Sequence, residues 1–134
     1  MRKSKHILIV DDHPTLREGL RSLLSSQNLF DIVGEAGDGL EAIELVGKLH
    51  PDLVLMDISM PGMDGIAATR EIKEKWPETK ILIFSVYKTS EYLKAALEAG
   101  ADGYILKDSP RTKLILSIKD ILAGNQVISL DSTE

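Results

Sequence analysis

The sequence contains no cysteine among its 134 residues, no concentrated run of basic residues and no apolar stretch long enough to cross a membrane. Without cysteine there are no disulfides and no thiolate chemistry, which is typical of intracellular proteins. A formal net charge of −5 without a basic patch argues against unaided binding of nucleic acids. The apolar run Ile7–Val10, behind a basic N-terminus, is too short for a signal peptide. We therefore expect a cytoplasmic protein that makes no membrane contact.

The composition is that of an ordinary globular chain. The sequence is 43% hydrophobic and 28% charged, which separates it from disordered chains. Its length suits one domain with a proper core and leaves little room for a second. Because the last ten residues are polar, we expect residues 1–124 to form the domain and residues 125–134 to be a linker or C-terminal tail.

Short apolar runs alternate with segments of helical periodicity five times along the chain. The expected strands are His6–Val10, Phe30–Ala36, Leu53–Met56, Lys80–Phe84 and Asp102–Leu106. Apolar residues recur at helical spacing after each of them, as at Leu16, Leu20 and Leu23. Strict alternation of this kind predicts a five-stranded parallel sheet with right-handed crossovers and helices on both faces, which is a doubly wound α/β fold.

Polar residues follow four of the expected strands. Asp11 and Asp12 follow the first, Asp57 the third, Ser85 the fourth and Lys107 the fifth. Because the carboxyl ends of parallel strands share one edge of a sheet, we expect these side chains in one crevice. Singly, each has a plainer interpretation, since an aspartate can cap a helix, a serine can start a turn and a lysine can be solvated. Together they are harder to explain by chance.

The chemistry of this set is specific. Three carboxylates at one edge repel one another and need a cation, and oxygen ligands with water favour Mg²⁺ over Ca²⁺. A lysine ammonium and a serine hydroxyl beside them can hold phosphate oxygens. The set therefore predicts in-line phosphoryl transfer to the Asp57 carboxylate, at a strand end that Pro61-Gly62 terminates.

These residues, with Met60-Pro61-Gly62-Met63-Asp64-Gly65, resemble the motif set of the response-regulator receiver domain of two-component systems. The resemblance covers about residues 5–124 and implies a flavodoxin-like (βα)5 fold. It implies that Asp57 accepts a phosphoryl group from a partner histidine kinase. It further implies Mg²⁺ held by Asp12, Asp57 and the backbone carbonyl of Ser59, with Asp11 acting mainly through metal-bound water.

The same resemblance assigns the remaining roles. Ser85 and Lys107 would bind phosphoryl oxygens, and Tyr104 corresponds to the aromatic residue that rotates inward on activation. From the residue pattern alone, Tyr104 is equally compatible with a surface position on an edge strand. The implied chemistry is self-catalysed phosphoryl transfer and autodephosphorylation, so we do not expect an enzyme in the ordinary sense.

Further motifs are similar to the NarL/FixJ-type subfamily, notably Asp11-Asp12-His13-Pro14, Glu98 to Asp108 and Ile121 to Val127. Members of that subfamily regulate transcription and usually carry a LuxR-type helix-turn-helix domain after the linker. The sequence has no such domain, so we expect a truncated chain rather than a single-domain regulator, and DNA contact only through the absent C-terminal domain. Homodimerisation is expected through the first and fifth helices or through the face of the fourth and fifth.

Three positions depart from the common receiver pattern. Val86 stands where many receivers have alanine, so we expect narrower access to the site. Tyr87 could overhang Asp57 and slow the attack of water on the acyl phosphate. Asp108 follows Lys107 where many receivers have a proline after a cis bond, so we expect a trans bond here.

Two other classes of function use similar residues. A metal-dependent phosphatase would need a positioned acid or base, whereas His13, the nearest histidine, is expected to be solvated at a helix start. Multiple turnover on a phosphomonoester would favour that class, and stoichiometric labelling would favour the receiver. A nucleotide- or flavin-binding domain would need a glycine-rich first turn, and the first turn here is Asp-Asp-His-Pro.

Overall fold

The computed structural model describes residues 4–131, in which strands and helices alternate along the chain. The strands are β1 (Lys5–Val10), β2 (Phe30–Ala36), β3 (Leu53–Met56), β4 (Lys80–Ser85), β5 (Gly103–Leu106) and β6 (Val127–Ile128). The helices are α1 (Pro14–Ser25), α2 (Gly39–Leu49), α3 (Gly65–Lys75), α4 (Ser90–Glu98) and α5 (Arg111–Leu122). None of these helices is long and apolar enough to cross a membrane.

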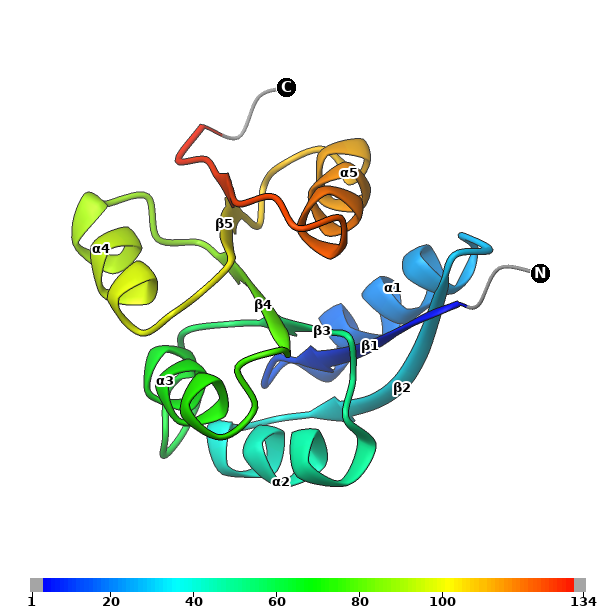
Figure 1. The fold of residues 1–134 in the computed structure, drawn as a ribbon. Coiled ribbons are helices and arrows are strands. Elements are labelled where there is room, and N and C mark those ends of the chain that lie inside the picture. Colours follow the sequence, from blue (N-terminus) through cyan, green and yellow to red (C-terminus); the bar gives the residue numbers. More distant parts are fainter. Residues whose placement is uncertain (1–3, 132–134) are drawn as a thin grey trace.

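The strands form one parallel sheet in the order β2-β1-β3-β4-β5-β6. Helices α1 and α5 cover one face, and α2, α3 and α4 cover the other (Figure 1). The doubly wound flavodoxin-like fold predicted from the sequence is therefore confirmed. The strand order reverses between β1 and β3, and the residues that follow these two strands leave the sheet at this topological switch point.

The expectation of five strands is wrong, because the described chain has a sixth. In β6, the Val127 N–H donates to the Asp102 carbonyl at 3.3 Å, and beyond it the Ser129 N–H donates to the Tyr104 carbonyl at 2.9 Å. Residues 127 and 128 lie in the segment that the sequence analysis expects to be a tail. A strand of two residues has no periodicity, so the apolar pattern could not reveal it.

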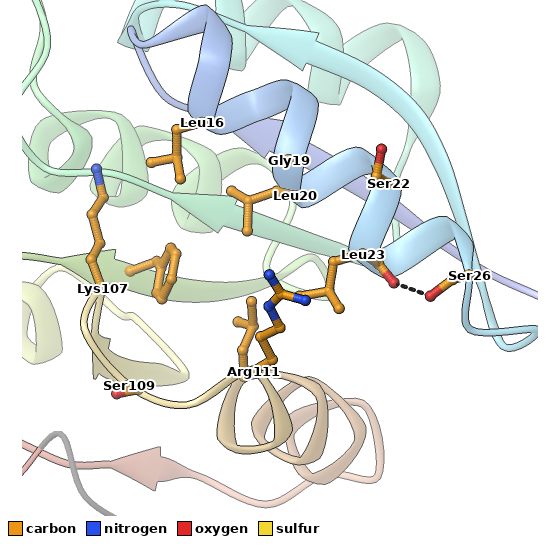
Figure 2. Close-up of a pocket in the computed structure, with 11 residues that line it drawn as sticks. Leu16, Gly19, Leu20, Ser22, Leu23, Ser26, Lys107, Ser109 and Arg111 are labelled. Atoms are coloured by element: carbon orange, nitrogen blue, oxygen red, sulfur yellow. Dashed lines mark hydrogen bonds between the residues drawn. The ribbon is translucent and has the colours of Figure 1, made fainter.

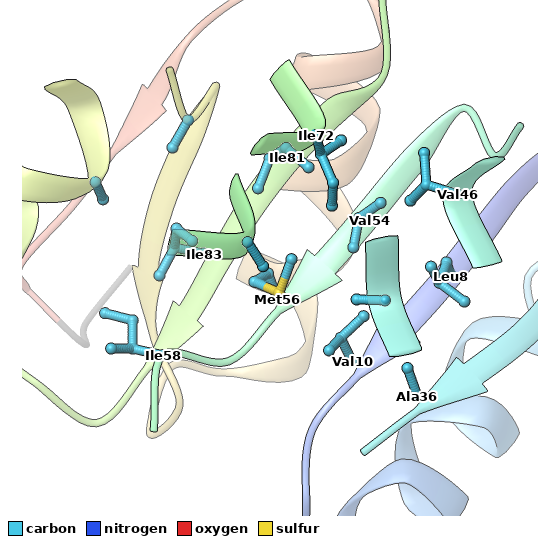
Figure 3. Packing of buried hydrophobic residues seen from close by; sticks show 14 of the residues in the cluster. Leu8, Val10, Ala36, Val46, Val54, Met56, Ile58, Ile72, Ile81 and Ile83 are labelled. Carbon is cyan, nitrogen blue, oxygen red and sulfur yellow. The ribbon is translucent and has the colours of Figure 1, made fainter. Parts of the chain in front are cut away.

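The apolar strand residues are buried on both faces of the sheet. In β1, Ile7 and Ile9 face the core under α1 and α5, while Leu8 and Val10 face the core under α2, α3 and α4 (Figure 3). All four are at most 1% exposed. This two-sided burial explains why the central strands are continuous apolar runs, and it makes the sheet a rigid platform for the residues at its carboxyl edge.

A close backbone approach fixes the loop that follows β3. A Cβ atom added to Gly65 would lie 1.8 Å from the carbonyl oxygen of Asp57, so only glycine fits there. The Gly65 N–H donates to the Ile58 carbonyl at 2.9 Å. Asp64 caps α3 as predicted, with its carboxylate accepting the Ala67 N–H at 2.8 Å. The loop is thus tied to the strand end on which Asp57 sits.

Candidate functional site

Asp57 lies at the carboxyl end of β3 and is almost fully buried, with 5% exposure. Its Oδ1 accepts the N–H of Ile58 at 2.8 Å. Burial raises the pKa of the Asp57 carboxyl above its ordinary value, and attraction to the Lys107 ammonium offsets this only in part. A poorly solvated carboxylate on a rigid strand end is suited to act as a nucleophile or a metal ligand.

Lys107, which follows β5, reaches back across the edge of the sheet to two carboxylates. Its ammonium nitrogen lies 2.7 Å from Oδ2 of Asp11 and 3.3 Å from Oδ2 of Asp57. Burial opposes ionisation of Asp11, but hydrogen bonds from Lys107 and His13 outweigh it and hold the pKa of Asp11 below its ordinary value. The structure therefore brings these three predicted residues together as one charged group.

Four side chains could hold a metal ion. Ligand atoms of Asp11, Asp12, His13 and Asp57 all lie within 4.8 Å of one another. Oδ1 of Asp12 is buried and accepts no hydrogen bond, although the His13 imidazole lies 3.1 Å away. A buried carboxylate oxygen that accepts no hydrogen bond and lies beside two further carboxylates fits a hard cation that prefers oxygen ligands. Ser59, whose carbonyl was implied as a further ligand, lines the same groove as Asp12.

His13 has a role that the sequence analysis did not foresee. It stands at the N-cap position of α1 with a side chain that is 65% exposed, which agrees with a solvated helix start. Its Nδ1 nevertheless lies 2.8 Å from Oδ1 of Asp11. That hydrogen bond raises the pKa of the imidazole, and the charge of Asp12 adds to the effect. The histidine therefore orients the acid pair rather than acting independently of it.

Ser85 and Tyr104 belong to a second group, beside Lys107. Ser85 is fully buried at the end of β4, and its hydroxyl accepts the N–H of Tyr87 at 3.0 Å. Tyr104 is also fully buried, and its hydroxyl donates to the Tyr87 carbonyl at 2.7 Å. The alternative of an edge-strand surface position for Tyr104 is therefore wrong.

Tyr87 lies across the loop that follows β3. Its hydroxyl is hydrogen-bonded to the hydroxyl of Ser59, and its ring stacks on Tyr92 of α4 with centroids 4.1 Å apart and planes 12° apart. Val86 points outward, with 62% exposure. Position in the sequence indicated that Tyr87 is close to the site, but the contacts with Ser59 and Tyr92 depend on side-chain orientation.

Arg17 is a supporting residue that the sequence analysis missed. Its guanidinium donates to the backbone carbonyl of Asp11 and to Oε1 of Glu35, the latter at 3.1 Å. Glu35 in turn accepts from Arg21 at 2.6 Å. Arg17 thus ties the end of β1 to β2 and to α1. On the polar face of a helix, an arginine carries no sequence signal that distinguishes this role from a solvated position.

The fold and the site together define a flavodoxin-like α/β domain with an acidic, lysine-bridged centre at its topological switch point. The sequence pattern of the response regulator receiver domain matches residues 7–119. The chain belongs to the response-regulator receiver family. Its expected trans bond between Lys107 and Asp108 is confirmed, since no peptide bond in the described chain is cis.

Similar proteins include regulators of the LuxR type. The chain is 38% identical over 122 residues to the transcriptional regulatory protein DegU of Brevibacillus brevis, covering 91% of this chain and 52% of DegU. It is 42% identical over 128 residues to the oxygen regulatory protein NreC of Staphylococcus aureus strain JH9, covering 95% of this chain and 59% of NreC. A crystal structure of a LuxR-family two-component response regulator from Aurantimonas sp. SI85-9A1 is 41% identical, with a TM-score of 0.91 over 95% of this chain and 91% of that one. The chain therefore spans less than two thirds of the length of DegU and of NreC.

Proposed function

We propose that Asp57 accepts a phosphoryl group from the phosphohistidine of a partner histidine kinase. A carboxylate oxygen of Asp57 attacks phosphorus, the P–N bond breaks, and the histidine of the kinase leaves with the electron pair and takes up a proton from solvent. The observation that carries this proposal is the buried Asp57 carboxylate with the Lys107 ammonium 3.3 Å away. The acyl phosphate formed would place new negative charge where that ammonium already lies.

Asp11, Asp12, Asp57 and the carbonyl of Ser59 would hold Mg²⁺, with Asp11 acting mainly through metal-bound water. Bound there, the ion would neutralise charge on the phosphoryl oxygens. The buried Oδ1 of Asp12, which accepts no hydrogen bond, supports this assignment. Exchange of Asp12 for asparagine should raise the Mg²⁺ concentration needed for half-maximal labelling, whereas exchange of the exposed Asp31 should leave it unchanged.

The roles of the remaining residues follow from their positions. Lys107 and the hydroxyl of Ser85 would bind phosphoryl oxygens, and Tyr104 would transmit the change through its bond to the Tyr87 carbonyl. Chemistry of this kind is self-catalysed and stoichiometric, because the acceptor is consumed until water hydrolyses the acyl phosphate. We therefore propose a switch rather than an enzyme of multiple turnover.

The decisive experiment is intact-mass spectrometry after incubation with acetyl phosphate, with and without Mg²⁺. The wild type should gain the mass of one phosphoryl group only when Mg²⁺ is present, and Asp57→Asn should gain none. Asp31→Asn, which alters an exposed aspartate on β2, should behave as the wild type does. Absence of an adduct in the wild type would refute the proposal, and turnover of many substrate molecules per chain would favour a phosphatase.

An open groove between α1 and α5 supports a partner on that side. Leu16, Leu20 and Leu23 line it from α1 and Arg111 lines it from α5, while Lys107 lies at one end (Figure 2). A helix of the kinase seated there would bring its phosphohistidine to the edge of the sheet that holds Asp57. Alanine at Leu23, which lines the groove away from Lys107 (Figure 2), should slow labelling by a phosphorylated kinase without changing labelling by acetyl phosphate.

The similarity to the transcriptional regulatory protein DegU supports an output in transcription. We propose that residues 1–124 act as the receiver of a cytoplasmic regulator whose DNA contacts are made by a separate C-terminal domain. Homodimerisation on phosphorylation remains a prediction, through the α1–α5 face or the α4–α5 face. Light scattering with and without acetyl phosphate would test it, since a mass that stays that of one chain in both samples would contradict dimer formation.

A further inference from the structure

Residues 127–131, called the C-terminal strap below, are bound along the outer edge of β5. The pairing is parallel and extends past β6, because Ser129 donates its N–H to the Tyr104 carbonyl at 2.9 Å. In Figure 1 the red segment lies beside β5. On the α5 side, the Lys113 ammonium donates to the Ser129 hydroxyl at 2.7 Å and to the carbonyl of Asp131. The strap is therefore held by main-chain bonds to a strand and by a lysine clamp from a helix.

The strap also joins both apolar cores. Val127 packs against the cluster under α1 and α5, and Leu130 packs against the opposite cluster, to which Tyr104 belongs. At Gly103 an added Cβ would meet the Val127 carbonyl oxygen at 3.0 Å and Ile121 at 2.5 Å. Main-chain pairing combined with side chains that enter alternate sites is the way an extended peptide binds a sheet edge. The edge of β5 is thus shaped to receive this segment.

Tyr104 connects the strap to the site. Its hydroxyl donates to the Tyr87 carbonyl at 2.7 Å, and its own carbonyl accepts from Ser129 at 2.9 Å. Tyr87 in turn donates its N–H to the Ser85 hydroxyl at 3.0 Å. A continuous set of hydrogen bonds therefore runs from Ser85, at the edge that holds Asp57, through Tyr87 and Tyr104 to the strap.

We propose that the edge of β5 and Lys113 form a docking surface for this chain's own residues 127–131, and that phosphorylation of Asp57 tightens the docking. The inference rests on the proposed function of Asp57. A phosphoryl group that holds Ser85 and Lys107 fixes the ends of β4 and β5, which restrains Tyr87 and Tyr104. Linkage makes the effect reciprocal, so a docked strap stabilises the phosphorylated form. The strap is then the part of the chain through which the site reaches whatever lies beyond residue 131.

Hydrogen exchange of the whole 134-residue chain tests whether phosphorylation of Asp57 tightens the docking of the strap. With acetyl phosphate and Mg²⁺, the amides of Val127 and Ser129 should exchange about threefold or more slowly than without the donor, a change of the size that one net hydrogen bond gives. Asp57→Asn should show no change. The intact mass of the protein in each sample is measured by mass spectrometry, which shows whether the phosphoryl adduct has formed. No adduct means that the proposed function fails, whereas an adduct with unchanged or faster exchange overturns only the inference.

Two proline variants test the reciprocal effect, which is that the docked strap stabilises the phosphorylated form. Ser129→Pro removes the N–H that donates to the Tyr104 carbonyl and also the hydroxyl that accepts from Lys113. Ile128→Pro removes an N–H that points away from β5, since donors alternate along a parallel ladder, and it is the matched control. Ser129→Pro should shorten the lifetime of the phosphorylated form about threefold or more relative to Ile128→Pro, as expected for loss of at least one net hydrogen bond. Equal lifetimes in the two variants would overturn the coupling.

The lysine clamp gives an independent comparison. Lys113→Ala removes the donor to Ser129, while Lys119→Ala removes an exposed lysine further along the same helix. Only Lys113→Ala should accelerate exchange of the Val127 and Ser129 amides in the phosphorylated chain. If both variants exchange at the wild-type rate, Lys113 does not hold the strap and the docking surface must be restricted to the edge of β5.

Discussion

Lys107 and Asp11 are joined by a charged hydrogen bond of 2.7 Å between the ammonium nitrogen and Oδ2. The same ammonium lies 3.3 Å from Oδ2 of Asp57. One carboxylate therefore holds the lysine at the place where another would receive the phosphoryl group. Because Asp11 stays ionised through its hydrogen bonds, the lysine does not have to be recruited from solvent when new charge appears on Asp57.

Replacing Lys107 by alanine should slow labelling by acetyl phosphate about tenfold or more, since a hydrogen bond to a charged group contributes about 1.5–3 kcal/mol. Removal of the ammonium would also leave Asp11 and Asp57 to repel each other. The control is Lys88→Ala, which removes a lysine that is 63% exposed and paired with Asp108. Initial rates of adduct formation by intact mass provide the comparison, and equal rates for both variants would contradict the role given to Lys107.

Replacing Tyr87 by alanine should accelerate loss of the phosphoryl group. Its hydroxyl contacts Ser59 and its ring stacks on Tyr92, so the side chain lies across the loop beside the acidic group. We expect the dephosphorylation rate to rise about threefold, and Tyr87→Phe, which keeps the ring, to fall between the alanine variant and the wild type. The decay of the adduct after removal of the donor is the measurement. An unchanged rate in Tyr87→Ala would show that the ring does not restrict water.

The predicted elements and the predicted site have the same physical basis. The central strands β1, β3, β4 and β5 contain apolar runs because both faces of the sheet are covered there, and such runs are visible in a sequence. The site residues could be predicted because parallel strands bring their carboxyl ends to one edge. Neither argument needs side-chain orientations, which is why the sequence alone predicts that Asp11, Asp57 and Lys107 lie together, as the structure has them.

The contacts that the sequence did not reveal depend on orientation or on the main chain. All four residues of β5 are buried, so its pattern could not assign a direction to Tyr104. The bond from Arg17 to the Asp11 carbonyl depends on the path of a long side chain. Val127 in β6 and Ser129 just beyond it pair through backbone groups that every residue except proline has, and their side chains therefore carry little signal.

Gly65→Ala should destabilise the fold strongly, because the added methyl group would lie 1.8 Å from the Asp57 carbonyl oxygen, a backbone atom that cannot move freely. We expect a loss of about 3 kcal/mol or more, as for other severe steric conflicts in a packed interior. Gly19→Ala is the matched control, since nothing lies within 4 Å of its added Cβ and it is exposed in α1. It should be stabilising by up to about 1 kcal/mol. Urea unfolding of both variants tests the pair, and similar midpoints would contradict the close approach.

Glu35→Gln should lower stability in a pH-dependent way. The hydrogen bond from Arg21 outweighs partial burial and, with Arg17, holds the pKa of Glu35 below its ordinary value of 4.5. A carboxyl whose pKa is lowered by folding stabilises the protein fully above the unfolded-state pKa, and the contribution disappears as the pH falls through the folded-state pKa. At neutral pH we therefore expect the variant to lose about 1 kcal/mol, near the upper end for a partly exposed ion pair.

In acid, the free energies of unfolding of the wild type and of Glu35→Gln should become equal. Glu35 itself becomes protonated there, and glutamine mimics its uncharged form. Glu44→Gln, which alters a pair with Lys48 that is 66% exposed on both sides, should change stability much less at every pH. Urea midpoints measured across the acid range give the comparison. A loss in Glu35→Gln that persists unchanged below the folded-state pKa would mean that the glutamate acts through packing rather than charge, and that Arg17 does not need it to hold the Asp11 carbonyl.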